Sequence, residues 1–167
     1  LFGAAEKVVT TKELIDKSTL ANLKIKCIVL KHPNIRKKMT YAEELEYIVS
    51  NEKRLDFVVN LLRYLRGNTL CLFQLVEKHG KILNDKMKGS ENVYFVYGGT
   101  DTSDREKIRG LVETHTKSTT IASFGVFSTG INIRNINNIV LASPSKSKIR
   151  VLQSIGRGLR RSETKHS

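Results

Sequence analysis

The chain has 167 residues, of which 40% are hydrophobic, so it is long enough for one ordinary domain with a substantial core. It carries 29 Lys and Arg against 16 Asp and Glu, which gives a formal net charge of +13. This excess favours polyanionic partners such as nucleic acid, although a surface that is basic only for solubility has the same composition. The apolar runs are too short to span a bilayer, and no signal peptide is recognisable. The two cysteines, Cys27 and Cys71, have no disulfide or metal-site spacing, and we interpret both as buried core thiols.

Five short segments rich in apolar and β-branched residues are predicted to be strands: residues 25–30, 69–73, 93–97, 119–123 and 138–142. Each segment is mostly apolar rather than alternating, which is typical of strands that are covered on both faces. Helical patterns separate most of these segments. The sequence therefore predicts an α/β domain with a parallel sheet flanked by helices.

Three helices are predicted between these strands. Thr40 and Glu43 have the spacing of a capping box that opens the first helix, and a second helix is expected over residues 52–66, before Gly67. A second capping box, Ser103 to Glu106, predicts a helix through about residue 113 that follows a turn at Gly98 and Gly99. Residues 1–50 are interpreted as a lead-in segment with one strand, and residues 51–167 as the domain.

The segment after the last predicted strand combines an apolar stripe with a polar one. Ile149, Leu152, Ile155 and Leu159 recur at spacings of three and four, as on the buried side of a short helix. Gln153, Arg157 and Arg160 fall within roughly 60° of one another on a helix, so these three side chains can converge on one ligand. Guanidinium groups suit the charge that develops on a transferred phosphoryl group. A solvated basic helix face remains the alternative.

The same residues resemble a known motif. Gln153, Gly156, Arg157 and Arg160 are similar to motif VI of the superfamily 2 helicases. Residues 119–132, Thr-Thr-Ile-Ala-Ser-Phe-Gly-Val-Phe-Ser-Thr-Gly-Ile-Asn, resemble motif V, and residues 68–74, Asn-Thr-Leu-Cys-Leu-Phe-Gln, resemble motif IV. All three occur in the family's order. Within the superfamily, the UvsW-type DNA helicases of T-even-type phages are the most similar, through residues 124–130, 147–149, 151–153 and the early stretches 1–3, 9–14 and 23–25.

This resemblance implies a second RecA-like helicase lobe over residues 51–167, preceded by a lead-in from the first lobe. The family's second lobe continues through a further strand after motif VI, so we expect the sheet to lack its last strand and the lobe to be cut short at its C-terminal end. A lobe interface and a sheet edge would then be exposed, and we expect self-association through one of them.

The resemblance also implies roles for individual residues. Arg157 and Arg160 would act at the γ-phosphate across the lobe interface, with Arg160 as the arginine finger, and Gln153 would position them or contact nucleotide. In motif V, Gly130 and Asn132 match positions near the ribose and the catalytic water, although Asn132 stands where the superfamily often has Asp. Ser123 matches a hydroxyl residue that contacts a nucleic-acid phosphate.

Other candidate nucleic-acid contacts rest on weaker likeness. Gly98 and Gly99 resemble a second loop that contacts the nucleic-acid backbone, and Gln74 ends the motif IV strand. Lys146 and Lys148 belong to a basic cluster before motif VI that suits DNA phosphates or, equally, solvent. Three aromatic residues in these motifs, Phe73, Phe124 and Phe127, are interpreted as core residues rather than base-stacking platforms.

Half of a motor site is missing from this sequence. It contains neither the phosphate loop Gly-x-x-x-x-Gly-Lys-Ser/Thr nor an Asp-Glu pair that would hold magnesium. ATP and Mg²⁺ would therefore be cofactors of a complete enzyme that also contains a first RecA-like lobe, and we predict no metal ligand in this chain. Alone, the chain is expected to hydrolyse no ATP.

The leading hypothesis is the second motor lobe of an ATP-dependent DNA helicase or translocase in the cytoplasm, that of the host if the protein is phage-encoded. Likeness to UvsW-type helicases implies branched DNA, such as forks, junctions and R-loops, as the substrate. Two alternatives remain open: a catalytically silent nucleic-acid-binding module, and the lobe of an RNA helicase or a restriction-type motor.

Overall fold

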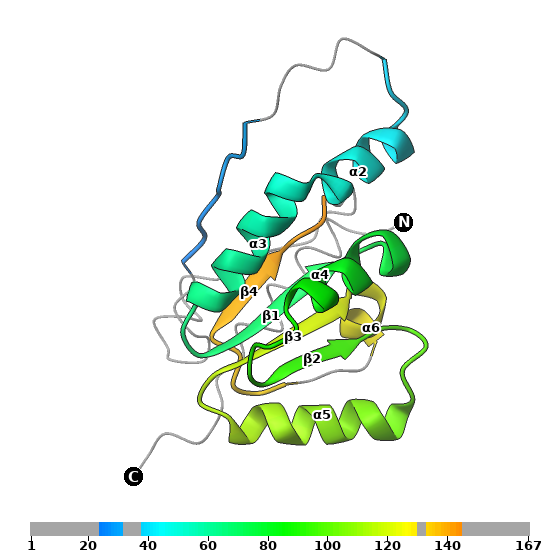
Figure 1. Cartoon of the computed structure of the whole chain (residues 1–167). Helices are drawn as coiled ribbons and strands as arrows, with labels where there is room; N and C mark the ends of the chain where they lie inside the picture. The colour runs from blue at the N-terminus through cyan, green and yellow to red at the C-terminus, as the bar shows by residue number, and fades with distance from the viewer. Residues whose placement is uncertain (1–23, 32–37, 130–132, 145–167) are drawn as a thin grey trace, which may run out of the picture.

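The computed structural model describes residues 24–31, 38–129 and 133–144 of the chain. These residues form a parallel sheet covered by helices on both faces, as the sequence predicts (Figure 1). In chain order the elements are α2 (Tyr41–Ser50), α3 (Glu52–Tyr64), β1 (Asn68–Phe73), the π-helix η1 (Val76–Gly80), α4 (Lys81–Lys86), β2 (Val93–Val96), α5 (Thr102–Thr114), β3 (Ser118–Ser123), α6 (Phe124–Thr129) and β4 (Asn138–Leu141).

The four described strands lie in the order β2-β3-β1-β4, and every neighbouring pair is parallel. The two central strands, β1 and β3, are buried along their whole length, whereas β2 and β4 are only partly buried at the edges. Full burial on both faces explains why the central strands are continuous apolar or β-branched runs. Four of the five predicted strands are thus confirmed within one or two residues at each end.

Alternate residues of β1 enter two separate cores. Cys71 and Phe73 pack with α3 and α4, in a cluster that includes Leu55 and Leu83. Leu70 and Leu72 face the other way and pack with Val112 of α5 and with aromatic residues of α6. Figure 1 shows this arrangement, with α5 below the sheet and α3 and α4 on its opposite face. The prediction that Phe73, Phe124 and Phe127 are core residues is confirmed, because each is at most 4% exposed.

The capping box predicted at Thr40 is present. The Thr40 hydroxyl accepts from the Glu43 N–H at 3.3 Å, and the Thr40 N–H donates to the Glu43 carboxylate at 2.8 Å. The Thr40 hydroxyl also donates to the Glu43 carboxylate at 2.9 Å, and the two hydrogen bonds that Thr40 donates to this carboxylate lower the pKa of Glu43. The helix that they start, α2, contacts α3 and η1 and buries Leu45 and Val49, so residues of the predicted lead-in segment pack directly on the lobe.

The helices α3 and α5 differ in their ends from the prediction. Helix α3 stops at Tyr64 rather than at residue 66, because Leu65 already has extended backbone and Gly67 has a φ of +79°. A Cβ at Gly67 would lie 2.5 Å from the Asn137 side chain, so a glycine is required there. Helix α5 begins at Thr102 with Asp101 as its N-cap, and the predicted capping box at Ser103 is wrong because Ser103 is already inside the helix.

The predicted strand over residues 25–30 is also wrong. Residues 24–31 have no regular secondary structure, and Ile25 and Val29 are 65% and 82% exposed. The physical reason is the lack of a strand partner among the described residues, since β propensity reflects packing against neighbours more than an intrinsic preference. Cys27 in this segment is exposed, so our interpretation of it as a core thiol is wrong, whereas Cys71 is buried as expected.

Candidate functional site

Because the four described strands are parallel, their carboxyl ends meet at one edge of the sheet, which we call the carboxyl edge. Gln74 follows β1, Gly98 and Gly99 follow β2, and Ser123 ends β3. The register places Phe73 opposite Ser123 and Val96 opposite Ala122. Open α/β sheets bind ligands at this edge. The four predicted nucleic-acid contacts that lie in the described part of the chain are therefore brought to one side of the molecule.

Gln74 and Ser123 differ in their access to a ligand. Gln74 is exposed, and its backbone N–H donates to the Ser143 hydroxyl at 3.1 Å. Ser123 is only 8% exposed and lies where β3 passes directly into the short helix α6. The Gln74 side chain is thus free to meet a ligand, whereas the Ser123 hydroxyl has little surface for one.

The turn at Gly98 and Gly99 is exposed and firmly held. The Thr100 N–H donates to the Tyr97 carbonyl at 3.0 Å, and the Tyr97 N–H donates to the Thr100 hydroxyl at 3.1 Å. Arg105 reaches back from α5 and donates to the Gly98 carbonyl at 3.0 Å. A Cβ at Gly99 would lie 2.7 Å from the Tyr97 ring, whereas one at Gly98 would meet nothing within 4 Å. The turn therefore presents backbone in one fixed shape.

A buried polar cluster beside this edge was not predicted from the sequence. Ser143, just after β4, is 4% exposed, and its hydroxyl lies 2.9 Å from Nδ1 of His79, a fully buried residue of η1. Arg54 of α3 donates to the carbonyl of Ala142, the residue that precedes Ser143. We call Arg54, His79 and Ser143 the polar junction. The sequence does indicate that His79 is buried, because His79 stands three residues after Val76 and four before Leu83, the spacing of residues on the buried face of a helix.

Burial and charge set the protonation of the junction. Burial, reinforced by the positive charge of Arg54, lowers the pKa of His79 to about 4, so the imidazole is neutral at neutral pH. Burial likewise lowers the pKa of Arg54. The Cys71 thiol, buried nearby on β1, has its pKa raised to about 12 by desolvation and is therefore an unreactive thiol.

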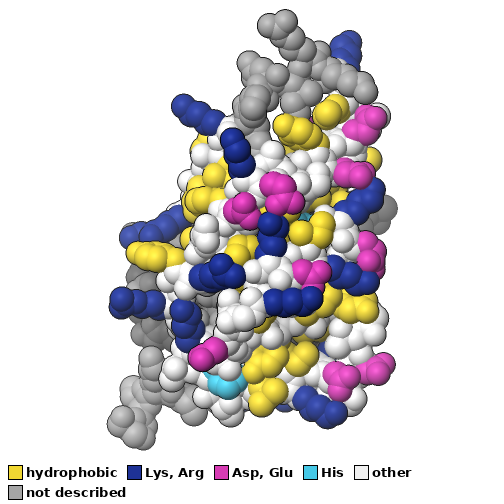
Figure 2. Space-filling view, in the orientation of Figure 1, with side chains coloured by type: hydrophobic (Ala, Val, Ile, Leu, Met, Phe, Trp, Pro, Cys, Tyr) yellow, Lys and Arg dark blue, Asp and Glu magenta, His cyan; other side chains and the backbone are white. Residues whose placement is uncertain are grey.

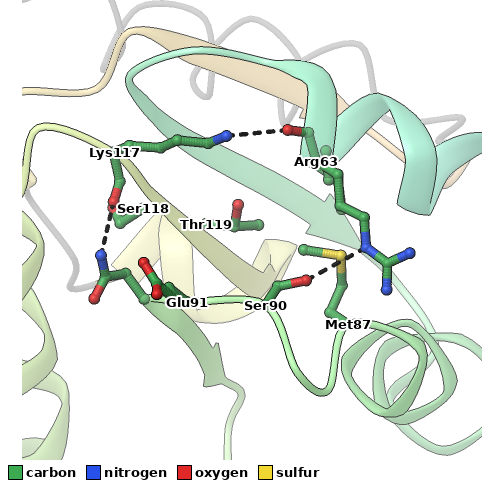
Figure 3. Close-up of a pocket in the computed structure, with 9 residues that line it drawn as sticks. Arg63, Met87, Ser90, Glu91, Lys117, Ser118 and Thr119 are labelled. Atoms are coloured by element: carbon green, nitrogen blue, oxygen red, sulfur yellow. Dashed lines mark hydrogen bonds between the residues drawn. The ribbon is translucent and has the colours of Figure 1, made fainter.

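A pocket of about 270 Å³ lies at the opposite edge of the sheet, where β2 and β3 begin (Figure 3). Lys117 donates to the Arg63 carbonyl at 3.1 Å, and the Arg63 guanidinium donates to the Ser90 hydroxyl at 3.3 Å. Through these hydrogen bonds, Lys117 and Arg63 connect the end of α3 to the loops that precede β2 and β3. The pocket shares no residue with the carboxyl edge and is separate from the predicted site.

The surface agrees with the basic composition. In the view of Figure 2, Lys and Arg side chains gather on the left of the molecule, while Asp and Glu alternate with them on the right.

None of the helices in the described ranges is long and apolar enough to cross a membrane. Residues 24–31, 38–129 and 133–144 also contain no group of three His, Cys, Asp or Glu placed to hold a metal ion.

Comparison with known proteins decides the family. The model of the helicase conserved C-terminal domain matches residues 53–162, about two thirds of the chain. The chain belongs to this helicase C-terminal domain family. The resemblance that the motifs indicated is thereby confirmed, and the matched range contains every candidate site residue named above.

A phage helicase extends the match, both through its sequence and through its crystal structure. The ATP-dependent DNA helicase uvsW of Enterobacteria phage T4 is 38% identical over 173 residues, which cover 99% of the chain and 34% of that protein. The crystal structure of T4 UvsW superposes with a TM-score of 0.63 at 39% identity, covering 72% of the chain and 25% of the UvsW chain. The chain thus spans about a third of the length of the curated relative that it matches.

The nucleotide half of the helicase site stays a prediction. Its proposed residues, together with the basic cluster before motif VI, lie outside the described residues: Gly130, Asn132, Lys146, Lys148, Gln153, Arg157 and Arg160. Two further expectations also stay predictions: that the sheet lacks its last strand, and that a first lobe completes the site.

Proposed function

We propose that this domain is the second motor lobe of an ATP-dependent DNA helicase or translocase that acts on branched DNA. The observation that carries the proposal is the 38% identity to a DNA helicase over 99% of the chain. The carboxyl edge supports it, because an exposed Gln74 and the exposed, fixed turn at Gly98 and Gly99 place an amide and backbone groups at the same edge of the sheet. Such groups suit the phosphate backbone of nucleic acid.

In this proposal ATP and magnesium bind between the domain and a first RecA-like lobe, which supplies the phosphate loop and the metal ligands. ATP supplies the phosphoryl group whose transfer drives the cycle. Arg157 and Arg160 place positive charge where negative charge develops on that group, and Gln153 orients them. Gly130 and Asn132 lie near the ribose and the attacking water. Without the first lobe these groups have no substrate to act on, so the domain alone hydrolyses no ATP.

Nucleic acid is held by a second set of residues. Gln74 and the turn at Gly98 and Gly99 contact one DNA strand at the carboxyl edge, and Lys146 and Lys148 add positive charge near the phosphates. Closure on ATP and opening after hydrolysis advance these contacts along the strand. The protein works in the cytoplasm, that of the host if it is phage-encoded, and the domain by itself self-associates through its sheet edge or its lobe interface.

A first experiment measures DNA-stimulated ATP hydrolysis by the full reading frame that contains this chain. Arg160→Ala should lower the stimulated rate by about a thousandfold, the lower end of the range found for arginine fingers. Arg134→Ala is the matched control, since Arg134 is an exposed arginine that precedes β4 and therefore lies on the side of the sheet where the strands begin, away from the carboxyl edge. Equal rates for the two variants would remove the finger assignment.

A second experiment uses the 167-residue chain itself. Its binding to forked DNA, single-stranded DNA and RNA is measured by fluorescence anisotropy between about 50 and 200 mM salt, where phosphate-led binding weakens steeply. We expect the tightest binding to forked DNA and a lower affinity for Gln74→Ala. A reading frame without a phosphate loop, combined with salt-sensitive binding, would instead support a catalytically silent nucleic-acid-binding module.

A further inference from the structure

The end of β4 is fastened to three other elements at a single point. The Ala142 N–H donates to the Leu72 carbonyl of β1 at 2.9 Å, and the Ala142 carbonyl accepts from Arg54 of α3. The next residue, Ser143, is bound by both Gln74 and His79. A strand end that is held from a neighbouring strand, a helix and a π-helix has little freedom to shift relative to the sheet.

The Ser143 hydroxyl is the shared atom of this arrangement. Its oxygen accepts the Gln74 N–H at 3.1 Å and lies 2.9 Å from Nδ1 of His79. Because the His79 imidazole is neutral, the serine proton can be donated to Nδ1 while the oxygen accepts from Gln74. One hydroxyl therefore joins the residue after β1 to the π-helix and to the exit of β4. Loss of the hydroxyl breaks both hydrogen bonds at once.

The placement of His79 has a local cause. It lies in η1, where both the His79 N–H and the Gly80 N–H donate to the Leu75 carbonyl, at 3.1 and 2.9 Å. A Cβ at Gly80 would lie 2.4 Å from the Phe73 ring, so the glycine lets the π-helix lie directly on that ring. Irregular π-turns of this kind are frequent at functional sites. Here the turn brings a fully buried imidazole under the end of β4.

Gln74, His79 and Ser143, which are joined by the Ser143 hydroxyl, also link the nucleic-acid half of the proposed site to its nucleotide half. Gln74 belongs to the nucleic-acid side, and Ser143 stands ten residues before Gln153, the first residue of the arginine motif. We propose that His79 and Ser143 are positioning residues that couple DNA contact at Gln74 to the arginine motif. The proposal rests on the motor function proposed above. DNA bound at Gln74 acts through the Ser143 hydroxyl on the exit of β4, from which the chain continues in sequence to Gln153, Arg157 and Arg160.

Coupling makes a different prediction from simple structural support. Ser143→Ala removes the shared hydroxyl, whereas Ser143→Thr keeps it. Ser143→Ala loses two neutral hydrogen bonds, one to Gln74 and one to His79. We therefore expect it to lower the ratio of DNA-stimulated to basal ATP hydrolysis by roughly fivefold to tenfold at saturating DNA. The basal rate and the KM for ATP should stay within about twofold of the wild type. Ser143→Thr should restore most of the ratio.

A direct readout of the junction is available in the 167-residue chain. Amide hydrogen exchange at Gln74 should accelerate in Ser143→Ala and return towards the wild-type rate in Ser143→Thr. His79→Phe, which fills a similar volume without ring nitrogens, should lower the stimulation ratio in the full protein as Ser143→Ala does. Should His79→Phe fail to fold, the comparison of Ser143→Ala with Ser143→Thr decides.

The outcomes separate this inference from the motor function. A full protein that shows no DNA-stimulated ATP hydrolysis in its wild-type form overturns both. A wild-type protein that is stimulated by DNA, together with a Ser143→Ala variant of unchanged ratio, overturns the coupling alone. Equal losses of basal and stimulated rates in Ser143→Ala also overturn it, because that pattern shows a merely structural role.

Discussion

The Asn68 side chain makes three hydrogen bonds at the amino end of β1, so replacing Asn68 should destabilise the fold more than replacing an exposed asparagine does. The residue is 2% exposed. Its amide group donates to the carbonyls of Val112 and His115 at 3.1 and 2.9 Å, and its carbonyl accepts from the Ser118 hydroxyl at 2.8 Å. It thereby ties the end of α5 and the start of β3 to the central strand.

The magnitude follows from those three bonds. Each neutral hydrogen bond contributes about 0.5–1.5 kcal/mol, so Asn68→Ala should lower the free energy of unfolding by about 2–4 kcal/mol. For a domain of this size that corresponds to a fall in Tm of about 5–15 °C. Asn68→Asp keeps the shape, but its carboxylate cannot donate to the two carbonyls, so it should be at least as destabilising.

Urea unfolding followed by circular dichroism measures the difference. Asn60→Ala is the matched control, because Asn60 is an exposed asparagine on α3 and its replacement should change stability by no more than about 0.5 kcal/mol. If Asn68→Ala and Asn60→Ala unfold at the same urea concentration, the hydrogen bonds of Asn68 do not support the fold in the way described.

Three further predictions concern stability and reactivity. Gly80→Ala should destabilise the domain by about 1–3 kcal/mol in the same urea assay, because the added Cβ would lie 2.4 Å from the Phe73 ring. His79 has a folded-state pKa of about 4, below its usual value, so the unfolded chain binds its proton more tightly. The stability that neutral His79 contributes is complete above about pH 6.5 and is lost as the pH falls towards 4, and His79→Phe should remove this part of the pH dependence. A thiol reagent at neutral pH should label Cys27 in the folded protein and Cys71 only after unfolding, because Cys71 is buried and its pKa is raised to about 12.

Each of these predictions has a control. Gly110→Ala places the same methyl group in the middle of α5, where nothing lies within 4 Å, and should stabilise the domain by about 0.5–1 kcal/mol. A destabilising Gly110→Ala would show that helix propensity is misjudged. For His79, equal pH profiles of wild type and His79→Phe would contradict the assigned shift, and rapid labelling of Cys71 would contradict its burial.

The sheet could be predicted because its signal is local. The central strands are buried on both faces, so the residues of 69–73 and 119–123 are selected for burial without alternation, and such runs are recognisable in the sequence. The same criterion failed for residues 25–30, which are also mostly apolar but have no strand beside them in the part of the chain that the structure describes. An apolar run indicates that a segment tends to be buried, but whether another element covers it depends on the tertiary structure.

Part of the candidate site could be predicted for a topological reason. Parallel strands end at one edge, so recognising motifs IV and V as strand ends was enough to place Gln74 and Ser123 together. The polar junction could not be predicted in this way, because its bonds join residues that are 64 to 88 positions apart. Nothing in the neighbourhood of His79 specifies that Ser143 will lie beside it.

The π-helix η1 implies a testable pattern among related sequences. A π-turn holds one residue more than an α-turn, so the chain between Phe73 and Leu83 is one residue longer than a regular α-helix would need. Deleting that residue would let the helix become regular and would rotate His79 by about 100° away from Ser143. Homologous lobes that have lost one residue in this interval should therefore also have lost the histidine, so a single-residue gap in an alignment marks the lobes that lack the junction.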